Sequence, residues 1–328
     1  MNKSSKRLSN PSNVQLSPKE EVSNLAQVNF FDIDEHQEGQ RIDNFLLTKL
    51  KGVPRAHVYK LIRDGEIRLN KKRCKPHERL TAGDVVRVAP VRFVNKQTPV
   101  IGKEFANSLL GRIVYEDEGL MVLNKPFGMA VHGGSGESFG VIEALRVASS
   151  KPYLELIHRI DKDTSGLLMI AKKRSTLKDL QERLREKKLQ KYYLCLVRGH
   201  IKPKSQLIDK PLLKYTLENG ERRVKVAYTD EAKSSQTKVT VLAHILIEGQ
   251  PVSVVQCEPK TGRTHQIRVH MASIGHPLLG DDKYHPQDTS KVRRLCLHAW
   301  RLEVSGYPPL IAPIPEDIKA YLGDVTLI

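Results

Sequence analysis

The sequence predicts an α+β protein in which a small helix–strand unit precedes a large mixed-sheet domain. Residues 41–64 carry apolar side chains at helical spacing and are followed by two short runs that alternate like strands. From residue 111 onward, strand-like runs recur and a few helical segments separate them. The chain has 328 residues, of which 39% are hydrophobic, which is enough for one large domain and one small one.

The first segment of the chain is polar. Residues 1–27 are rich in Ser, Asn, Lys and Pro and hold few apolar residues, so we expect a disordered tail. This segment lacks the apolar core of a secretory signal, and no apolar run approaches the length of a membrane span. The four cysteines are scattered without a C-x-x-C pair, which predicts neither a disulfide framework nor a thiolate zinc site. We therefore expect a cytoplasmic protein without membrane contact.

Residues 28–95 are predicted to form a compact unit. Two helices are expected, with apolar faces made of Ile42, Phe45, Leu46 and Leu50 in the first and Val58, Leu61 and Ile62 in the second. Pro54 is suited to the first turn of the second helix, and Asp64-Gly65 is a turn signal. The runs EIRLN and DVVRVAP then alternate like short strands, separated by the basic hairpin Lys71-Lys72-Arg73.

Positive charge is concentrated in this unit. The whole chain has a net charge of +17, and residues 39–97 hold seven Lys and eight Arg against three Asp and two Glu. Such an excess favours a polyanionic partner. The residues predicted to clamp backbone phosphates are Arg41, Arg55, Lys60, Arg63, Arg68, Lys71, Lys72 and Arg73. The order of elements resembles the RNA-binding module named after ribosomal protein S4; the alternative is a solvated basic domain without a ligand.

Residues 96–110 are predicted to be a linker, and residues 111–328 the large domain. Strands are expected at IVYED and LMVLNK, and a helix at GVIEALRVA. A charged helix follows Lys172, and YYLCLVRG is a strand. Residues 201–235 read as hairpins or an insertion, before the strands TKVTVLAHILIEG, PVSVVQCEPK and RLCLHAWRLEV.

The stretch LELIHRIDKDTSGLLMIAK, residues 154–172, is organised around a polar loop. Two apolar runs flank the segment from His158 to Gly166, which predicts a strand, a polar turn and a second strand. Buried flanks of this kind would hold a reactive side chain rigidly. Taken alone, the pattern fits a charged surface hairpin equally well.

A second dense motif, TGRTHQIRVHMASIGHPLLGD, spans residues 261–281. Thr261-Gly262 predicts a turn and His265 to Met271 the first turns of a helix. The five-residue spacing of His265 and His270 puts them on different helical faces, and no H-E-x-x-H pattern is present, so no metal site is predicted. These histidines are instead expected to support the site through polar contacts. The chain also lacks a G-x-S-x-G elbow and a phosphate-binding G-K-[ST] loop.

Several long motifs together resemble one family. The runs HRIDKDTSGLLMIAKK, LNKPFGMAVHGGSG, QKYYLCLVRG and CEPKTGRTHQIRVHMASIGHPLLGD are similar to the pseudouridine synthases of the RluA/RluC type, whose hallmark is H-R-L-D-x-x-T-S-G. Ile160 stands where Leu is usual, and Lys125-Pro126 matches a block of structural role. The resemblance runs from about residue 39 to the end. It implies a long, bent, mainly antiparallel sheet flanked by helices, with the active cleft across its middle.

The resemblance also implies roles for individual residues. Asp161 matches the aspartate that acts on the ribose of the target uridine. Arg159 matches the arginine that enters the RNA stack when the base leaves it. Tyr193 matches the tyrosine that packs on the flipped base, and Arg268 the basic partner of the catalytic carboxylate. A neighbouring guanidinium favours the charged form of a carboxylate, which the reaction requires.

The implied activity is the conversion of uridines in large-subunit ribosomal RNA to pseudouridine. The base must leave the RNA stack at a cost of a few kcal/mol. No redox change occurs and no outside group is transferred, so we expect no cofactor and no metal. The partner is ribosomal RNA, free or in an assembling pre-50S particle, and we expect a monomer. The alternatives are a non-catalytic RNA-binding or ribosome-assembly protein and a synthase acting on tRNA. The sequence does not identify the modified uridines. It also leaves open whether Asp161 attacks the sugar or removes a proton from it.

Overall fold

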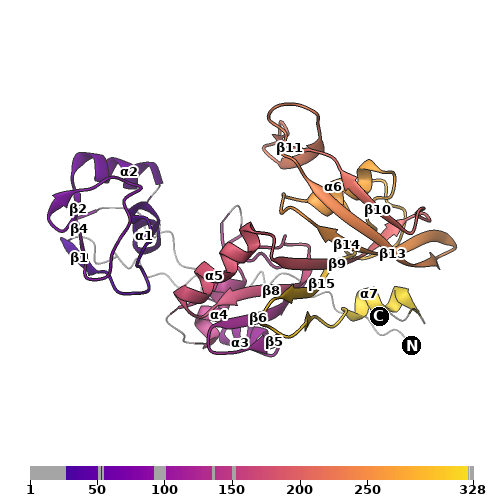
Figure 1. Cartoon of the computed structure of the whole chain (residues 1–328), viewed down its shortest axis with the longest axis horizontal. Coiled ribbons are helices and arrows are strands. Elements are labelled where there is room, and N and C mark those ends of the chain that lie inside the picture. The colour runs from indigo at the N-terminus through magenta and orange to yellow at the C-terminus, as the bar shows by residue number, and fades with distance from the viewer. Residues whose placement is uncertain are drawn as a thin grey trace. The chain divides into compact units, whose positions relative to one another are not determined.

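The computed structural model describes residues 27–50, 53, 55–91, 101–134, 137–149, 153–323 and 325. The chain divides into two compact units, Met1–Gly102 and Lys103–Ile328, coloured from indigo to yellow along the chain in Figure 1. The predicted tail, residues 1–27, lies outside the described residues except for Gln27.

The first unit combines two helices with a four-stranded antiparallel sheet. The strand order is β1–β4–β2–β3. The elements are β1 (Asn29–Asp32), α1 (Ile42–Lys49), α2 (Arg55–Asp64), β2 (Ile67–Leu69), β3 (Lys72–Arg73) and β4 (Val85–Val88). The apolar helix positions expected from the sequence are all buried in one core with the sheet. The unit therefore has a hydrophobic core of its own.

The helix and strand predictions for this unit are confirmed. The second helix begins directly after Pro54, which lies outside the described residues, and Gly65 ends it with a φ of +77°. Asn70 and Lys71 both have positive φ and form the tight turn between β2 and β3. Strand β3 falls within the predicted basic hairpin, and strand β1 was not predicted. It is a four-residue edge strand with alternating partial burial, and its pairing with β4 is a long-range contact.

The second unit is built on a ten-stranded sheet. The main path is β10–β13–β14–β9–β15–β8–β6–β5, with β7 paired to β8 and β16 to β15. The strands are β5 (Ile113–Glu116), β6 (Leu120–Lys125), β7 (Glu155–Leu156), β8 (Ser165–Ala171), β9 (Leu189–Arg198), β10 (Ser205–Asp209), β13 (Gln236–Ile247), β14 (Gln250–Pro259), β15 (Leu297–Val304) and β16 (Leu310–Ile311). All neighbours on the path are antiparallel except β15 and β8, which are parallel.

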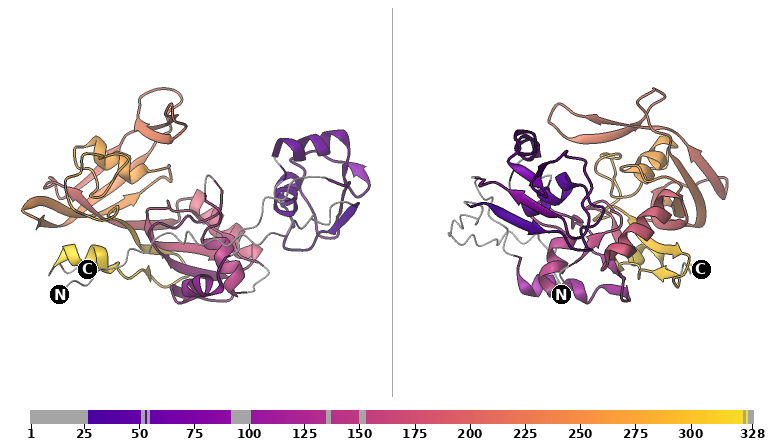
Figure 2. Two further views of the ribbon diagram at one scale, coloured as in Figure 1. Left: turned by 180° about the vertical axis from the view of Figure 1, so that it is seen from behind. Right: turned by 60° about the vertical axis from the view of Figure 1, so that its left-hand side comes forward.

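Helices and one separate hairpin complete this unit. The helices are α3 (Lys103–Leu110), α4 (Val141–Ser149), α5 (Arg174–Arg185), α6 (Gln266–Ser273) and α7 (Glu316–Leu322). Strands β11 (Leu212–Thr216) and β12 (Arg222–Val226) form a two-stranded hairpin that stands out from the large sheet on the side of α6 (Figure 2). Among the described residues, no helix is both long and apolar enough to cross a lipid bilayer.

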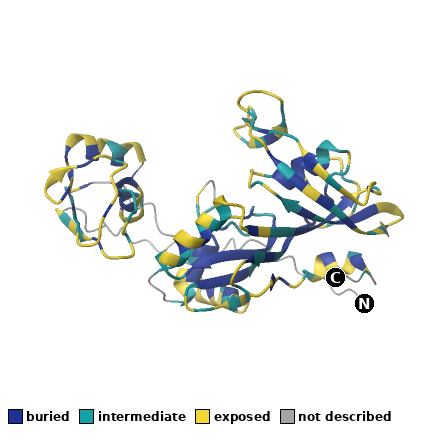
Figure 3. Cartoon of the chain, viewed as in Figure 1, coloured by how far each residue is buried: buried dark blue, intermediate teal, exposed yellow. Residues whose placement is uncertain are grey.

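Two hydrophobic clusters pack against the sheet, and its central strands contribute to both. One cluster contains β6, β8 and α5 side chains, and the other contains β14 and α7 side chains. Leu302 of β15 and Leu189 of β9 belong to the first cluster. Trp300 of β15 and Leu194 of β9 belong to the second cluster. The central strands are therefore buried along most of their length (Figure 3). Rigid support of this kind suits a functional site at the middle of the sheet.

The predicted linker differs from the structure in its second half. Residues 103–110 form α3, which buries Ala106 and Leu109 and packs against α4, and the chain divides after Gly102. Helix α3 has only eight residues, and a helix of this length depends on packing against a partner that its own sequence does not show. Residues 92–100 lie outside the described residues.

Candidate active site

A pocket of about 120 Å³ brings the two dense sequence motifs together. Its walls come from the loop before β8, from β9, from β15, and from the stretch that runs from the end of β14 into the first turn of α6. The lining residues are Arg159, Ile160, Asp161, Thr164, Lys191, Tyr193, Pro259, Thr261, Gly262, Arg263, Thr264, His265, Gln266, Ile267, Arg268 and Leu297. All four residues predicted in the catalytic domain line this one pocket. A larger, mostly apolar hollow of about 590 Å³ beside β13 and α7 contains none of them.

The loop that carries Asp161 is held by a buried lysine. Lys125, at the end of β6, is fully buried, and its ammonium group donates hydrogen bonds to the carbonyls of Pro126 (2.9 Å), Met129 (2.7 Å) and Lys162 (3.0 Å). Burial lowers the pKa of Lys125 to about 7, although the nearby carboxylates of Asp163 and Asp161 oppose that shift. The K-P-x-G block therefore fixes the backbone next to the predicted catalytic aspartate.

The Thr-Ser-Gly end of the loop is fixed by the central sheet. Gly166 has a φ of +107°, and a Cβ atom there would lie 2.2 Å from the carbonyl oxygen of Ala299 on β15, so only glycine fits. Arg294 donates to the Ser165 hydroxyl (2.7 Å), which lies 2.8 Å from Nδ1 of His298. The Ser165 hydroxyl therefore connects Arg294 to His298. Ser165 is buried and does not line the pocket, so it anchors the loop and does not act as a nucleophile.

Asp161 faces the pocket with a side chain that is 27% exposed. Its backbone carbonyl accepts a hydrogen bond from the amide of Thr164 (3.1 Å), which closes the polar turn. The neighbouring Ile160 is buried and Arg159 is exposed. The loop therefore presents a carboxylate inside the pocket and a cation at its edge, which is the arrangement that the predicted roles require.

Tyr193 lies on β9 between β14 and β15, paired with Cys257 and Ala299. The residue is 9% exposed. Burial raises the pKa of its phenol, and the negative charge of Asp161 raises it further. The hydroxyl therefore stays protonated at neutral pH, so it can donate a proton or pack against a base but does not act as a phenolate.

Arg268 lies in the pocket, but its hydrogen bonds go to a different carboxylate from the predicted one. Its guanidinium binds Asp281 through two hydrogen bonds of 2.8 and 2.6 Å, and its side chain is 2% exposed. Burial lowers the pKa of Arg268, but the hydrogen bonds and charge of Asp281 outweigh that effect and the net shift is upward. Asp161 acts on this guanidinium through space. Arg268 thus forms a buried ion pair with Asp281 and not with Asp161. The catalytic role of Arg268 stays a prediction.

The two pocket residues His265 and Lys191 were not assigned to the site from the sequence. His265 was interpreted as a supporting histidine, yet its Nε2 lies 3.9 Å from Oδ2 of Asp161. Lys191 is a largely buried lysine on β9 whose pKa is lowered by burial. It precedes Tyr193 by two positions and therefore lies on the same strand face. This alternation, together with the K-x-Y pattern, is the signal that would have found it.

Gln266 organises the loop that precedes α6. Its side-chain oxygen accepts from the Thr261 hydroxyl (2.6 Å) and from the amide of Arg263 (3.1 Å). Its side-chain nitrogen donates to the carbonyl of Gln236 (2.8 Å) and to the Thr237 hydroxyl (2.9 Å). All hydrogen-bonding groups of this buried amide are in use. The T-G-R-T-H-Q motif therefore forms a rigid turn that places His265 in the pocket.

The other two histidines of this motif have structural contacts. His270 lies 2.9 Å from the Thr237 hydroxyl and 3.0 Å from the carbonyl of Lys210, and His276 lies 2.8 Å from the carbonyl of Arg198. Within the described part of the chain, no group of three or more His, Cys, Asp or Glu side chains is placed to hold a metal ion. The four cysteines are buried and free.

Most of the basic residues predicted to contact RNA are exposed in the first unit. The exposed ones are Arg55, Lys60, Arg63, Arg68, Lys71, Lys72 and Arg73. Arg41 is partly buried and forms a 2.7 Å ion pair with the fully buried Asp43, and Arg55 lies 3.6 Å from the same carboxylate. These two arginines therefore also stabilise the unit, while the others present their charge to solvent.

The chain matches known proteins over nearly its whole length. Residues 119–273 match the family described as RNA pseudouridylate synthase, and residues 40–86 match the S4 domain. The chain is 45% identical to ribosomal large subunit pseudouridine synthase C of Pasteurella multocida over 319 residues, or 93% of this chain and 95% of the relative. This chain belongs to the RNA pseudouridylate synthase family. The predicted RluA/RluC-type resemblance is thereby confirmed.

Further RNA pseudouridylate synthases support this assignment. Ribosomal large subunit pseudouridine synthase C of Escherichia coli K12 is 46% identical over 303 residues, covering 87% of this chain and 93% of the relative. The solved structure of human RNA pseudouridylate synthase domain containing 4 is 25% identical with a TM-score of 0.57, over 67% of this chain and 95% of that one. The solved structure of human RNA pseudouridylate synthase domain containing 1 is 29% identical with a TM-score of 0.54, over 62% of this chain and 83% of that one. The predicted fold class, an S4 domain followed by a synthase domain, is confirmed.

Proposed function

We propose that this protein is an isomerase that converts uridines of large-subunit ribosomal RNA to pseudouridine, with Asp161 as the catalytic carboxylate. The observation that carries the proposal is the pocket itself, where Asp161, Tyr193 and Arg268 meet although they lie on separate parts of the chain. The relatives that match almost the whole chain are named for the same reaction on the large ribosomal subunit.

The reaction follows from the chemistry of these groups. The bond between uracil N1 and the anomeric carbon breaks, the uracil rotates, and its C5 forms a new bond to the sugar. Asp161 would act on the sugar as a nucleophile or as a base. Tyr193 would pack against the flipped base, with its phenol protonated because burial raises its pKa. Arg159, exposed at the edge of the pocket, would fill the gap that the base leaves in the RNA.

The basic first unit supports an RNA partner. Seven of its predicted contact residues are exposed to solvent, and exposed cations bind phosphates without sequence selectivity. We propose that this unit binds ribosomal RNA, free or in an assembling particle, while the pocket performs the chemistry. We further propose a monomer working in the cytoplasm.

The test is a site-by-site pseudouridine map of large-subunit ribosomal RNA from cells with and without the protein. We expect specific sites to vanish in its absence, to return with the wild type, and to stay absent with Asp161→Ala. An unchanged map would contradict the ribosomal substrate, and the tRNA of the same cells would then be mapped. Return of the sites with Asp161→Ala would contradict the catalytic role of Asp161.

A further inference from the structure

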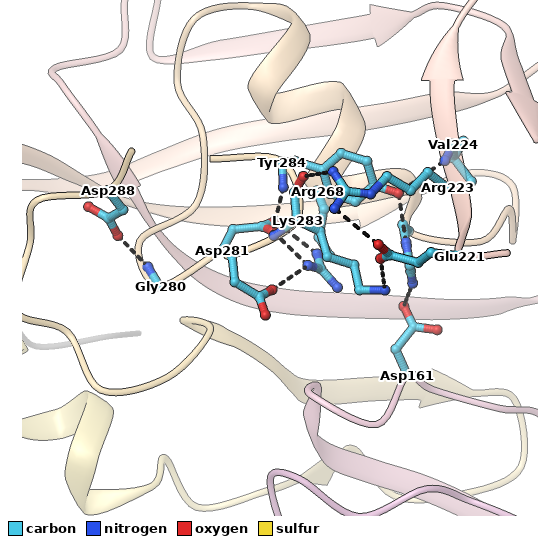
Figure 4. A network of polar contacts seen from close by, with 12 residues as sticks. Asp161, Glu221, Arg223, Val224, Arg268, Gly280, Asp281, Lys283, Tyr284 and Asp288 are labelled. Carbon is cyan, nitrogen blue, oxygen red and sulfur yellow. Dashed lines mark hydrogen bonds and ion pairs between the residues drawn. The ribbon is translucent and has the colours of Figure 1, made fainter. Parts of the chain in front are cut away.

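His265 occupies a position that its structural neighbours alone do not explain. It is the residue directly before α6, and its side chain makes no capping hydrogen bond to the helix. Instead, Nε2 lies 3.9 Å from Oδ2 of Asp161, while Nδ1 lies 2.7 Å from the hydroxyl of Tyr284. Figure 4 shows Asp161 at one end of this polar network and Tyr284 further along it. The imidazole thus connects the proposed catalytic carboxylate to a tyrosine.

The hydrogen bonds of Tyr284 determine which nitrogen of His265 carries the proton. The hydroxyl of Tyr284 accepts a hydrogen bond from the amide of Val224 (3.2 Å). Burial raises the pKa of Tyr284 to about 12, so the hydroxyl keeps its proton. Among the described residues, His265 Nδ1 is the acceptor within reach of that proton. His265 Nδ1 therefore accepts, and the neutral ring carries its own proton on Nε2, facing Asp161.

The backbone at His265 is held in an unfavourable conformation. Its φ of 51° and ψ of 22° place it in the left-handed region, which costs a residue with a side chain roughly 1 kcal/mol or more. The Gln266 hydrogen bonds next to it hold the turn in place. Strain that the surroundings maintain is found at sites where a side chain must point in one direction. Here that direction is toward Asp161.

The tyrosine is itself held by the separate hairpin. Lys283, next to Tyr284, forms a 2.6 Å ion pair with Glu221, and its carbonyl accepts a 2.8 Å hydrogen bond from Arg223 (Figure 4). Asp281 accepts the backbone amide of Tyr284 (3.0 Å) as well as the Arg268 guanidinium. The loop after α6 is thus fixed from both sides, so the position of the tyrosine hydroxyl is defined before RNA binds.

We propose that His265 is a positioning residue that donates its Nε2–H to Asp161 as RNA fills the pocket, and that Tyr284 fixes the tautomer that makes this possible. The inference rests on the proposed function. A separation of 3.9 Å is longer than a hydrogen bond, and such contacts often shorten only in the substrate complex. Asp161 is partly exposed and has room to move toward the ring.

The protonation state of His265 supports this arrangement. Burial lowers the pKa of His265, with Arg268 and Lys283 acting in the same direction and Asp161 and Asp281 opposing them. The ring is therefore neutral at pH 7 and depends on Tyr284 to select its tautomer. At a pH below its pKa, the imidazolium carries protons on both nitrogens, and the Nε2–H no longer depends on the tyrosine.

The test uses single-turnover rates at saturating ribosomal RNA from pH 5.5 to 8.5, with RNA affinity measured in parallel. The variants are His265→Phe, which removes the donor, His265→Gln, which keeps an N–H near the Nε2 position, and Tyr284→Phe, which removes only the hydroxyl. Tyr115→Phe is the matched control, because its hydroxyl binds Asp117 away from the pocket. Rates are expressed relative to wild type at each pH, which cancels the titration of groups that all proteins share.

We expect His265→Phe to lower the rate about 10- to 100-fold with unchanged RNA affinity, and His265→Gln to recover part of the loss. Tyr284→Phe should show a smaller loss at pH 8 that shrinks as the pH falls below the pKa of His265. A His265→Phe rate within twofold of wild type, or a Tyr284→Phe rate equal to wild type at pH 8, would overturn the inference. An inactive wild type would instead overturn the proposed function itself, so the two failures are distinguishable.

Discussion

The cations of the two units differ in how the protein holds them. In the first unit, Lys60, Arg63 and Lys72 extend into solvent. In the second unit, Lys125 and Arg268 are almost completely buried, and each makes two or three hydrogen bonds to fixed partners. Exposed cations are suited to attracting a phosphate backbone of any sequence, whereas buried and paired cations are suited to fixing atoms in place.

This difference indicates a division of work between the units. Removal of an exposed cation should weaken RNA binding and leave the fold intact, because surface charges contribute little to stability. Removal of a buried cation should damage the fold around the pocket, because its partner is left uncompensated. The following predictions test that contrast through the free energy of unfolding, the rate at saturating RNA, and RNA affinity.

The largest effect on stability is expected at the buried ion pair. Arg268→Met leaves the carboxylate of Asp281 buried without its partner, so the free energy of unfolding should fall by about 3–5 kcal/mol. Arg268→Met combined with Asp281→Leu should recover much of this stability, as measured by urea denaturation. If the double variant also recovers the full turnover rate, Arg268 has only a structural role and its predicted part in catalysis is wrong.

A slightly smaller effect is expected at Lys125. Lys125→Met leaves the carbonyls of Pro126, Met129 and Lys162 without their donor, which should cost about 2–3 kcal/mol. The turnover rate should also fall, since the loop carrying Asp161 loses its support. Lys173→Met is the control, because Lys173 pairs with the exposed Glu118 and should change stability by less than about 0.5 kcal/mol. Equal stability of the two variants would contradict the contrast between buried and exposed cations.

The buried histidines predict a dependence of stability on pH. Burial lowers the pKa of His298 to about 4 and that of His158 to about 3, against 6.5 for an ordinary histidine. As the pH falls below about 6.5, the unfolded chain binds protons that the folded chain does not, so stability decreases between pH 6.5 and 4. The loss should reach about 2 kcal/mol per histidine at pH 5. His298→Asn, whose side-chain oxygen can accept from Ser165, should show a shallower decrease in denaturation midpoints across this range.

The smallest effect on stability is expected in the first unit. The triple variant Lys60→Gln, Arg63→Gln and Lys72→Gln should unfold within about 0.5 kcal/mol of wild type, because all three side chains are exposed. RNA binding should weaken, and the slope of log K against log salt should decrease by up to about one unit for each phosphate that the variant no longer binds. A salt dependence identical to that of wild type would show that these side chains do not bind phosphate.

The sequence motifs identified residues that lie together in one pocket, but the contacts of these residues could not be predicted from the sequence. The positions of Asp161, Tyr193 and Arg268 follow from motifs, and all three line one pocket. The hydrogen-bond partner of Arg268 was not predicted, because Asp281 lies 13 residues further along the chain and no local pattern connects the two. His265 was left as a supporting residue for the same reason, since its link to Asp161 joins two segments about a hundred residues apart.

Several helices and strands were predicted from their side-chain patterns, whereas two short elements were missed. Helix α2 was found because Val58, Leu61 and Ile62 define an apolar face, and all three are buried. Helix α3 falls within the predicted linker and strand β1 was not predicted, because each is short and gains its stability from a distant partner, α4 and β4 respectively. Element order is therefore readable from sequence, whereas the order of strands in the sheet required the structure or the family.

The central claim, that the exposed cations bind the RNA while the pocket performs the chemistry, is tested most directly by one paired measurement. RNA affinity and single-turnover pseudouridine formation at saturating ribosomal RNA are compared for Asp161→Asn and for the triple Gln variant. We predict that Asp161→Asn binds RNA like wild type but loses at least about 10³-fold in rate, and that the triple variant binds more weakly but reacts at the wild-type rate once saturated. Retained turnover in Asp161→Asn, or a slow saturated rate in the triple variant, would contradict the account.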